Sequence, residues 1–307
     1  MIKKTLNLQN LNNILTLNTH SSFITILKKL SDNRLLSSSI DSIIIIYNKI
    51  TFKPEIIIKE HKNTIYYIEL LKKKNFIASC SKDLTIKIFE IFQFTYKLIH
   101  TLLAHTESVY KVIELKNENL LSCSFDKTIK LWKKKENNYF NINLINKNFA
   151  FNILEIKENI IVYDDFSNMK INFYDLNNNL LLTTLNFIYV IYFNIGNRFC
   201  LINENILLYF GYNNTIYIID INKYEIKNII THNDSYIVNS YKIRENEFFT
   251  GDYNGCIKHW VYENDNIKFL SCKNNIHLQY ICSIVIFNSN YILTGSGDKL
   301  IKLWKFN

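Results

Sequence analysis

The stretch LLSCSFDKTIKLW at residues 120–132 decides the fold, because it returns in closely similar form as ILTGSGDKLIKLW at residues 292–304. Each stretch ends in Trp, and an Asp stands six residues before that Trp. Five weaker copies keep an Asp or Asn six residues before an aromatic or apolar residue. The seven pairs are Asp41/Tyr47, Asp83/Phe89, Asp126/Trp132, Asn168/Tyr174, Asn213/Ile219, Asn254/Trp260 and Asp298/Trp304.

The closing residues of these copies follow one another at intervals of 41 to 45 residues, and each interval holds four short apolar segments. A period in the low forties with four strands per unit is typical of a β-propeller, in which every unit forms one blade. We therefore predict an all-β, seven-bladed β-propeller that occupies residues 1–307 as a single domain. The third strands of its blades are expected to end near residues 47, 89, 132, 174, 219, 260 and 304.

The third copy shows the expected strands most clearly, at residues 108–115, 120–124, 128–132 and 139–145. Together with the Asp–Trp spacing, this pattern resembles the WD40-repeat β-propeller family over the whole chain. The resemblance implies a structural tetrad in each blade: a His before the first strand, Ser or Thr on the second, Asp in the next turn and Trp on the third. The matching residues, with gaps where the sequence departs, are His20, Ser37, Asp41; His61, Ser79, Asp83; His105, Ser122, Asp126, Trp132; His232, Thr250, Asn254, Trp260; and His277, Thr294, Asp298, Trp304.

The fourth and fifth copies depart from this pattern, since they have no His and place Asp164 and Tyr209 at the second-strand position. We expect these two blades to depend on apolar packing alone. The resemblance also implies how the last blade is completed. Residues 13–19 are expected to supply its outer strand by pairing with the C-terminal strand, which covers an exposed sheet edge.

His105, Ser122 and Asp126 are also the residue types of an acyl-transfer triad. Their recurrence in blade after blade favours a structural network, because a catalytic triad is a single site beside an oxyanion hole. The sequence has no glycine-rich phosphate loop, and neither its seven His nor its six Cys have metal-ligand spacing. We therefore predict no enzyme activity, no catalytic residue, no cofactor and no metal, with the cysteines reduced.

The resemblance implies that partners dock on the top face, which is built by the loops before the first strand and between the second and third strands. Residues that flank the start of the first strand and the residue before the turn Asp face this surface. Aromatic residues occupy many of these positions, and aromatic side chains are common interface anchors. The predicted partner-binding residues are Phe23, Tyr66, Lys82, Tyr110, Phe125, Tyr212, Tyr253 and Tyr280.

A basic surface is the alternative, since the net charge is +9 and the pI is about 9.0. Three basic clusters fall on turns at the bottom of the first three blades, where they could meet RNA or an anionic membrane surface. Abundant lysine on an ordinary solvated surface explains them too, and it is the favoured interpretation. The clusters are Lys28, Lys29 and Arg34; Lys72, Lys73 and Lys74; and Lys133, Lys134 and Lys135.

The function predicted from the sequence is a non-enzymatic scaffold or adaptor subunit, by itself a monomeric propeller, that binds proteins or peptides of a larger intracellular complex. Its N-terminal residues MIKKTLNLQN lack the apolar core of a secretory signal. The longest apolar runs are of strand length, too short to span a bilayer. We expect a cytoplasmic or nuclear protein.

Overall fold

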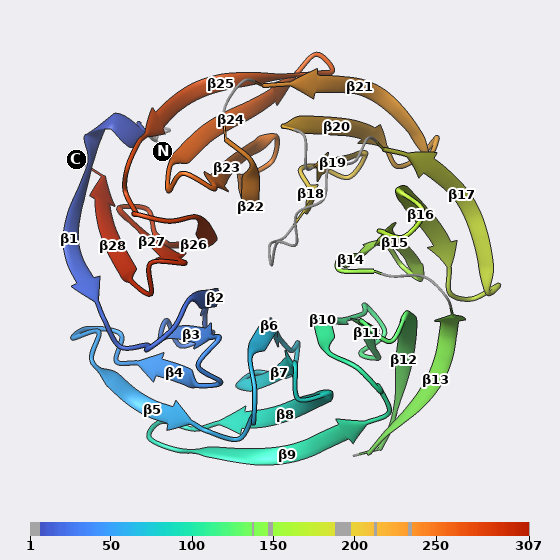
Figure 1. Cartoon of the computed structure of the whole chain (residues 1–307), viewed down its shortest axis with the longest axis horizontal. Coiled ribbons are helices and arrows are strands. Elements are labelled where there is room, and N and C mark those ends of the chain that lie inside the picture. Colours follow the sequence, from blue (N-terminus) through green and yellow to red (C-terminus); the bar gives the residue numbers. More distant parts are fainter. Residues whose placement is uncertain are drawn as a thin grey trace. The chain divides into compact units, whose positions relative to one another are not determined.

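The structure is a computed structural model that describes residues 7–136, 138–146, 150–187, 198–211, 214–232 and 235–306. Apart from a short 3₁₀ turn, η1 (Leu8–Asn10), every regular element in these residues is a β-strand. The strands form seven four-stranded sheets, and the predicted fold class, an all-β seven-bladed β-propeller, is confirmed. Figure 1 shows the blades, each coloured by its place in the sequence.

The blades are numbered here in chain order, and their strands run as follows. Blade 1 has β2 (Ile24–Lys29), β3 (Leu35–Ser39), β4 (Ile44–Tyr47) and β5 (Pro54–Ile58). Blade 2 has β6 (Ile65–Leu70), β7 (Phe76–Ser81), β8 (Thr85–Ile91) and β9 (Tyr96–Leu103). Blade 3 has β10 (Val109–Glu114), β11 (Leu120–Ser124), β12 (Thr128–Lys135) and β13 (Asn138–Asn146). Blade 4 has β14 (Ile153–Lys157), β15 (Ile160–Asp165), β16 (Lys170–Asp175) and β17 (Leu180–Asn186).

The remaining three blades follow the same order. Blade 5 has β18 (Phe199–Leu201), β19 (Ile206–Phe210), β20 (Thr215–Asp220) and β21 (Glu225–Thr231). Blade 6 has β22 (Ile237–Arg244), β23 (Glu247–Asp252), β24 (Ile257–Glu263) and β25 (Asn266–Lys273). Blade 7 has β26 (Ile281–Asn288), β27 (Tyr291–Ser296), β28 (Ile301–Phe306) and β1 (Leu11–Leu17).

The outer strand of blade 7 is β1, as the sequence predicted. It pairs antiparallel with β28, from Leu11 opposite Phe306 to Leu17 opposite Ile301 (Figure 1). The strand begins and ends two residues earlier than residues 13–19. The observed strand begins at Leu11 and ends at Leu17, and both of these apolar side chains are buried.

The chain forms two compact units, which we describe separately. The middle unit is Lys28–Tyr189, and the terminal unit combines Met1–Leu27 with Val190–Asn307. Within each unit the apolar core lies between neighbouring blades. In the middle unit, Ala78 and Ile88 of blade 2 pack with Val112 and Trp132 of blade 3. In the terminal unit, Phe249 of blade 6 packs with residues of blade 7 in the same way.

The structure describes the Asp or Asn of the turn between the second and third strands in six blades. In each of these turns the next residue has a left-handed backbone conformation. These residues are Ser42, Leu84, Lys127, Met169, Gly255 and Lys299, with φ between 56° and 74°. In four of the turns the Asp side chain accepts a hydrogen bond from the amide two residues on, as Asp126 does from Thr128 at 2.9 Å. This local bond stabilises the turn where glycine would otherwise be expected, which agrees with the low glycine content.

Candidate functional site

Hydrogen-bonded networks around a His fix the loops of three blades, and two of these networks are complete tetrads. In blade 3, the Trp132 indole donates to Ser122 Oγ at 2.8 Å, and Ser122 Oγ lies 2.7 Å from His105 Nε2. His105 Nδ1 lies 2.7 Å from Asp126 Oδ2. A neutral His with its proton on Nδ1 satisfies every contact, since it donates to Asp126 and accepts from Ser122. Burial lowers the pKa of His105 by more than the neighbouring Asp126 raises it. The lowered pKa favours the neutral form of the ring.

Blade 7 repeats the full network, with His277 2.8 Å from Asp298 and 2.7 Å from Thr294, to which Trp304 donates at 2.8 Å. In blade 2, His61 lies 2.7 Å from Asp83 and 2.6 Å from Ser79. Phe89 stands where Trp would be, so that blade has no indole donor.

Each turn Asp also receives a backbone amide from the loop that enters the blade. The amide of Thr106 donates to Asp126 Oδ2 at 3.1 Å, and the amides of Lys62 and Leu278 donate to Asp83 and Asp298 in the same way. Burial opposes the charge of Asp83 and Asp126, but the hydrogen bonds from His, Thr and backbone amides outweigh it and hold their pKa below the ordinary range. These carboxylates join the two loops that form the predicted top face.

The partial tetrads of blades 1 and 6 differ from the predicted pattern. In blade 1, Tyr47 replaces Trp, and its hydroxyl lies 3.0 Å from Ser37 Oγ. In blade 6, Trp260 donates to Thr250 at 2.8 Å, and the His232 ring lies 6.4 Å from the Trp260 ring. The turn of blade 6 is held by Asp252, which accepts from the amides of Asn254 and Cys256. Asn254 itself is exposed, so the role predicted for it belongs to Asp252.

The expectation that blade 4 depends on apolar packing alone is corrected by Asp164. This buried carboxylate accepts hydrogen bonds from the amide of Phe151 at 2.7 Å and from the amide of Asn152 at 2.9 Å. The Asn152 side chain adds a third bond at 3.1 Å. Asp164 therefore fixes the entering loop of blade 4 without a His. In blade 5, Tyr209 is fully buried and packs against Phe199 and Tyr217.

An aromatic surface crosses the top loops of the middle unit, and we call it the Tyr110 row. The Tyr110 ring lies 4.7 Å from both Tyr66 and Phe151, and 6.2 Å from Phe125, of which 40% is exposed. Phe166 continues the row 5.0 Å from Phe151. Tyr66, Tyr110 and Phe125 were predicted from the sequence. Phe151 was missed because blade 4 has no His to mark the start of its first strand. Phe166 was missed because it stands two residues before Asn168 instead of directly before it.

A second aromatic group, the Tyr280 cluster, lies on the corresponding loops of the terminal unit. Tyr253 and Tyr280 stack with ring centroids 5.8 Å apart and planes 16° apart, and Phe23 meets Tyr280 edge-on at 6.0 Å. Tyr236 lies 6.4 Å from Tyr253. Leu278, 91% exposed, follows His277 in the same loop. A side chain at Gly297 would meet the Tyr280 ring at 2.8 Å, so the missing Cβ makes room for that ring.

A backbone hydrogen bond explains why the two predicted sets of top-face residues come together. In blades 2, 3, 6 and 7 the amide of the residue before the turn Asp or Asn donates to a carbonyl at the start of the first strand. Thus Phe125 donates to Ser108 at 2.9 Å, and the exposed Lys82 donates to Thr64 at 2.8 Å. Tyr212 lies outside the described residues.

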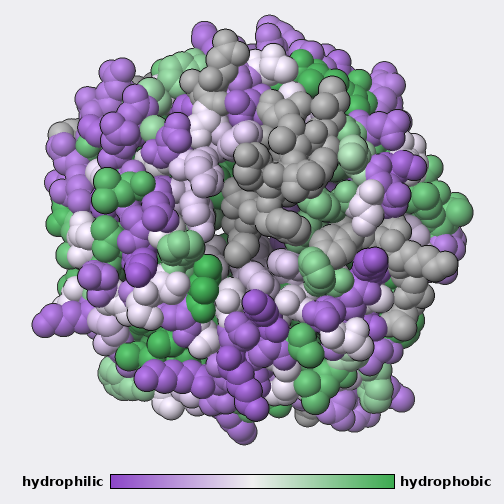
Figure 2. All heavy atoms as spheres, in the orientation of Figure 1, coloured by the Kyte–Doolittle hydropathy of each residue, from purple (hydrophilic) through white to green (hydrophobic). Residues whose placement is uncertain are grey.

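The phenols of Tyr110 and Tyr280 keep their protons, because burial raises the pKa of both. The surfaces therefore present apolar ring area and neutral hydroxyl groups. Figure 2 shows hydrophobic and hydrophilic residues interspersed on one face of the molecule.

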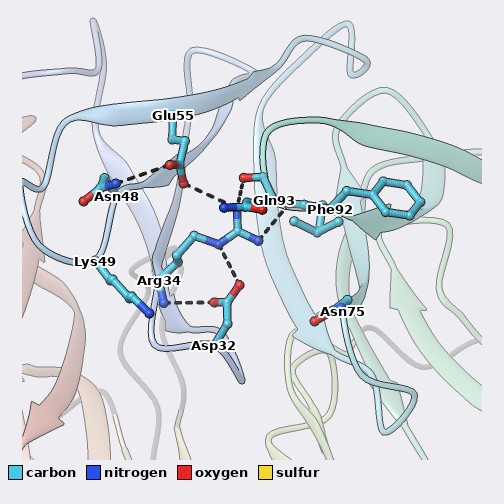
Figure 3. Close-up of a pocket in the computed structure, with 9 residues that line it drawn as sticks. Asp32, Arg34, Asn48, Lys49, Glu55, Asn75, Phe92 and Gln93 are labelled. Atoms are coloured by element: carbon cyan, nitrogen blue, oxygen red, sulfur yellow. Dashed lines mark hydrogen bonds and ion pairs between the residues drawn. The ribbon is translucent and has the colours of Figure 1, made fainter.

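Several predicted basic residues are engaged within the middle unit. Arg34 is buried, and Figure 3 shows its guanidinium between Asp32, Glu55 and the turn after β8. It donates to Asp32 Oδ2 at 2.7 Å and to the carbonyls of Gln93 and Phe92 at 2.8 and 2.9 Å. The assignment of Arg34 to an exposed basic patch is therefore corrected, because its charge stabilises the contact between blades 1 and 2.

The lysines of the predicted patch are divided between internal contacts and solvent. Lys28 is half-buried, lies 3.6 Å from Glu69 and donates to Tyr67 Oη at 3.2 Å. Lys72 donates to the carbonyls of Leu115 and Lys116, and Lys134 pairs with Glu118 at 2.8 Å. Lys29 is half-buried, whereas Lys73, Lys74, Lys133 and Lys135 are exposed.

The tetrads coincide with the segments that a family comparison detects. The family described as "WD domain, G-beta repeat" matches residues 52–90, 96–133 and 271–305. These segments contain the hydrogen-bonded His networks of blades 2, 3 and 7. Three segments of this chain match the WD40 repeat. A curated relative, an uncharacterized WD repeat-containing protein of Schizosaccharomyces pombe, is 30% identical over 118 residues. That match covers 38% of this chain and 22% of the relative, so it spans about a fifth of the relative's length.

The Ser–His–Asp and Thr–His–Asp trios of these segments are part of the packing. Ser122 and Thr294 are fully buried. The hydroxyl oxygen of each accepts a hydrogen bond from the indole N–H of the Trp in its blade. Within the described ranges, no group of three or more His, Cys, Asp or Glu side chains is arranged to hold a metal ion. No helix in that part of the chain has the length and apolar character needed to cross a bilayer.

Proposed function

We propose that this WD40 chain is a non-enzymatic scaffold or adaptor subunit that binds protein partners through the aromatic residues of its top loops. WD40 propellers generally serve as protein-interaction scaffolds and are typically not enzymes. The observation that carries the proposal is the Tyr110 row, in which five rings from three consecutive blades form one run. The exposed Phe125 is its most accessible member.

The Tyr110 row has the chemistry of an interface anchor. Large rigid rings bury much apolar area at a low entropic cost, and neutral phenols add hydrogen bonds. The turn carboxylates Asp83 and Asp126 hold the loops that carry it, so little ordering is required on binding. A partner peptide or domain of a larger complex is the proposed ligand, and the cytoplasm or nucleus is the proposed location.

The basic alternative has weaker support. The buried Arg34 and the Lys28–Glu69 and Lys134–Glu118 pairs reduce the charge available to a polyanion. Phosphate binding releases counterions and falls steeply with salt, whereas aromatic docking is much less sensitive. Salt dependence therefore separates the two functions.

The test is capture of partners by the tagged chain from its native cells, with quantitative mass spectrometry. The variant carries Tyr66→Ala, Tyr110→Ala and Phe125→Ala, and the matched control carries Phe94→Ala, which removes a ring that is 68% exposed in the turn between β8 and β9. Circular dichroism checks that both are folded. Truncating a good anchor costs about 2 kcal/mol or more, roughly a thirtyfold loss of affinity.

The proposal requires a stoichiometric partner set that survives about 1 M salt, where the screening length is about 3 Å. The triple variant should lose this set and the Phe94 variant should keep it. If the folded triple variant keeps every partner and the captured set disappears in high salt, the proposal fails and the exposed lysines become the binding surface. A Tyr253→Ala, Leu278→Ala variant shows separately whether the Tyr280 cluster contributes.

A further inference from the structure

The gap between blades 2 and 3 contains a cavity of about 480 Å³ that the proposed function does not use. Its aromatic lining comes from Phe76, His100 and Tyr139, and the last two rings meet edge-on at 5.6 Å. Its acidic lining comes from Glu90, Glu114 and Glu136. The three carboxylates outnumber the two lysines in the lining, although the chain as a whole carries a net charge of +9.

The gap between blades 1 and 2 has a cavity of the same volume, and there the chain supplies its own cation. The buried Arg34 guanidinium forms part of its wall, 3.5 Å from Glu55 and bonded to Asp32 and to two turn carbonyls (Figure 3). This wall shows that a planar cation can be held between two blades of this chain. The cation pairs with carboxylates of blade 1 and donates to carbonyls of the turn after β8 in blade 2.

Phe76 takes the place of Arg34 in the second gap. The two residues are equivalent by their turns, since Leu30 donates its amide to the carbonyl of Arg34 at 2.9 Å and Leu71 donates to that of Phe76 at 2.9 Å. The guanidinium of the first gap is thus replaced by a phenyl ring in the second. The Phe76 ring already receives a cation, because Lys73 Nζ lies 3.9 Å from its centroid.

The acidic side chains of the second gap are only partly compensated. Lys134 pairs with Glu118, 2.8 Å away. Glu114 accepts the amide of Lys72 at 2.5 Å, yet burial raises the pKa of its carboxyl. A second cation that pairs with Glu114 would offset this desolvation. The described residues form no metal-binding group here, so an organic cation fits better than a metal ion.

We propose that this cavity binds an arginine side chain of a protein partner. The guanidinium would stack on Phe76 in place of the Lys73 ammonium and pair with Glu90 and Glu114, as the internal Arg34 pairs with Asp32 and Glu55. Arginine suits the site better than lysine because its flat, delocalised cation stacks on rings and pairs with carboxylates at the same time. The site is separate from the Tyr110 row and does not depend on it.

The probe is N-acetylarginine amide, titrated into the full chain and followed by the NMR shift of the Lys72 amide. N-acetylcitrulline amide, a neutral ligand of nearly the same shape, is the matched control, and N-acetyllysine amide tests the preference for a guanidinium. An arginine-containing peptide and free arginine, measured in the same way, separate a protein partner from a metabolite. We expect saturable binding of the arginine probe, weaker binding of the lysine probe, no binding of the citrulline probe and a preference for the peptide over free arginine.

The variants are Glu90→Gln and Glu114→Gln, with Glu158→Gln as the control, since Glu158 is exposed and lies outside the cavity lining. Each lining substitution should weaken binding about tenfold, and the control should leave it unchanged. Glu90→Gln keeps the test valid if loss of the Glu114–Lys72 bond disturbs folding. Absence of saturable binding, equal binding of citrulline, or insensitivity to both lining variants would overturn the proposal. Because the assay contains no top-face partner, its outcome is independent of the scaffold experiment.

Discussion

Asp126 and His105 share a 2.7 Å hydrogen bond, although they belong to different loops of blade 3. The same carboxylate accepts the amides of Thr106 and Thr128, so one side chain connects the loop before β10 with the turn after β11. Phe125 precedes Asp126 in that turn, and Tyr110 lies at the start of β10. The network therefore sets the spacing of the Tyr110 row, and it can be tested through stability.

Replacing Asp126 with Ala should lower the free energy of unfolding by about 2–4 kcal/mol, because His105 and two amides lose a charged acceptor in a buried site. Urea unfolding measures the change. Glu158→Ala, which removes an exposed acid of the turn between β14 and β15, is the control and should change stability by less than about 0.5 kcal/mol. An Asp126→Ala protein as stable as the wild type would mean that the network has another role.

Acid should destabilise the protein in two stages. Burial lowers the pKa of His105 and His277 in the folded state, so the unfolded chain binds more protons and stability falls as the pH drops below about 6.5. The pKa of Asp83 and Asp126 is also lowered, by hydrogen bonds that outweigh burial, so their contribution is lost further down, below about 3.9.

Unfolding free energies measured by urea titration between pH 8 and pH 4 check the first stage. The double variant His105→Gln, His277→Gln should show a flatter dependence than the wild type below about pH 6.5, because it lacks two groups that take up protons on unfolding there. The same slope in both proteins would show that these histidines are not the groups responsible.

Trp132→Phe and Trp304→Phe each remove one indole donor while keeping most of the ring. Each should cost about 1 kcal/mol, since a buried Ser or Thr oxygen loses a hydrogen bond of 2.8 Å. Blade 2, which has Phe89 at this position, shows that a blade can form without the donor. The two substitutions lie in different units and share no partner, so their effects should add. A double variant that departs from the sum by more than about 0.5 kcal/mol would contradict this independence.

Arg34→Met should destabilise the middle unit by about 3 kcal/mol or more, because it leaves the largely buried Glu55 without its cation and two turn carbonyls without a donor. Arg34→Lys should recover little, since one ammonium cannot replace the fork that reaches Asp32 and both carbonyls. Thermal melting of the two variants beside Lys74→Met, an exposed control, measures the effect. Full recovery by lysine would show that the charge, and not the geometry, matters at this position.

The blades were predictable from the sequence because their signal is periodic. The Asp-to-Trp spacing of six residues locates a turn and a strand that every blade requires, and the apolar alternation on each side locates the other strands. The partner of β28 was predicted from the resemblance to the WD40-repeat family, which implies that an N-terminal segment supplies the outer strand of the last blade. Most tetrad contacts follow from the same spacing.

The departures arise where a side chain acts across blades or replaces a missing residue. Arg34 looks like an exposed turn residue, and only the carbonyls of Phe92 and Gln93, which lie 58 and 59 residues later, show why it is buried. Asp164 and Asp252 replace network members with a different residue type and geometry, so the family pattern does not predict their contacts. Phe151 was missed because the entry into blade 4 is fixed by Asp164 instead of a His, and Phe166 because it stands two residues before Asn168.

The pairing of β1 with β28 has a consequence for the order of synthesis. The two strands are separated by nearly the whole chain, from Leu17 to Ile301. A ribosome adds about 5–20 residues per second, so β1 waits roughly 15–60 seconds before its partner exists. During that time its backbone donors and acceptors are open to other strands. Molecular chaperones that shield a nascent edge would therefore be most important for β1, and blade 7 is completed only after the other six blades have been made.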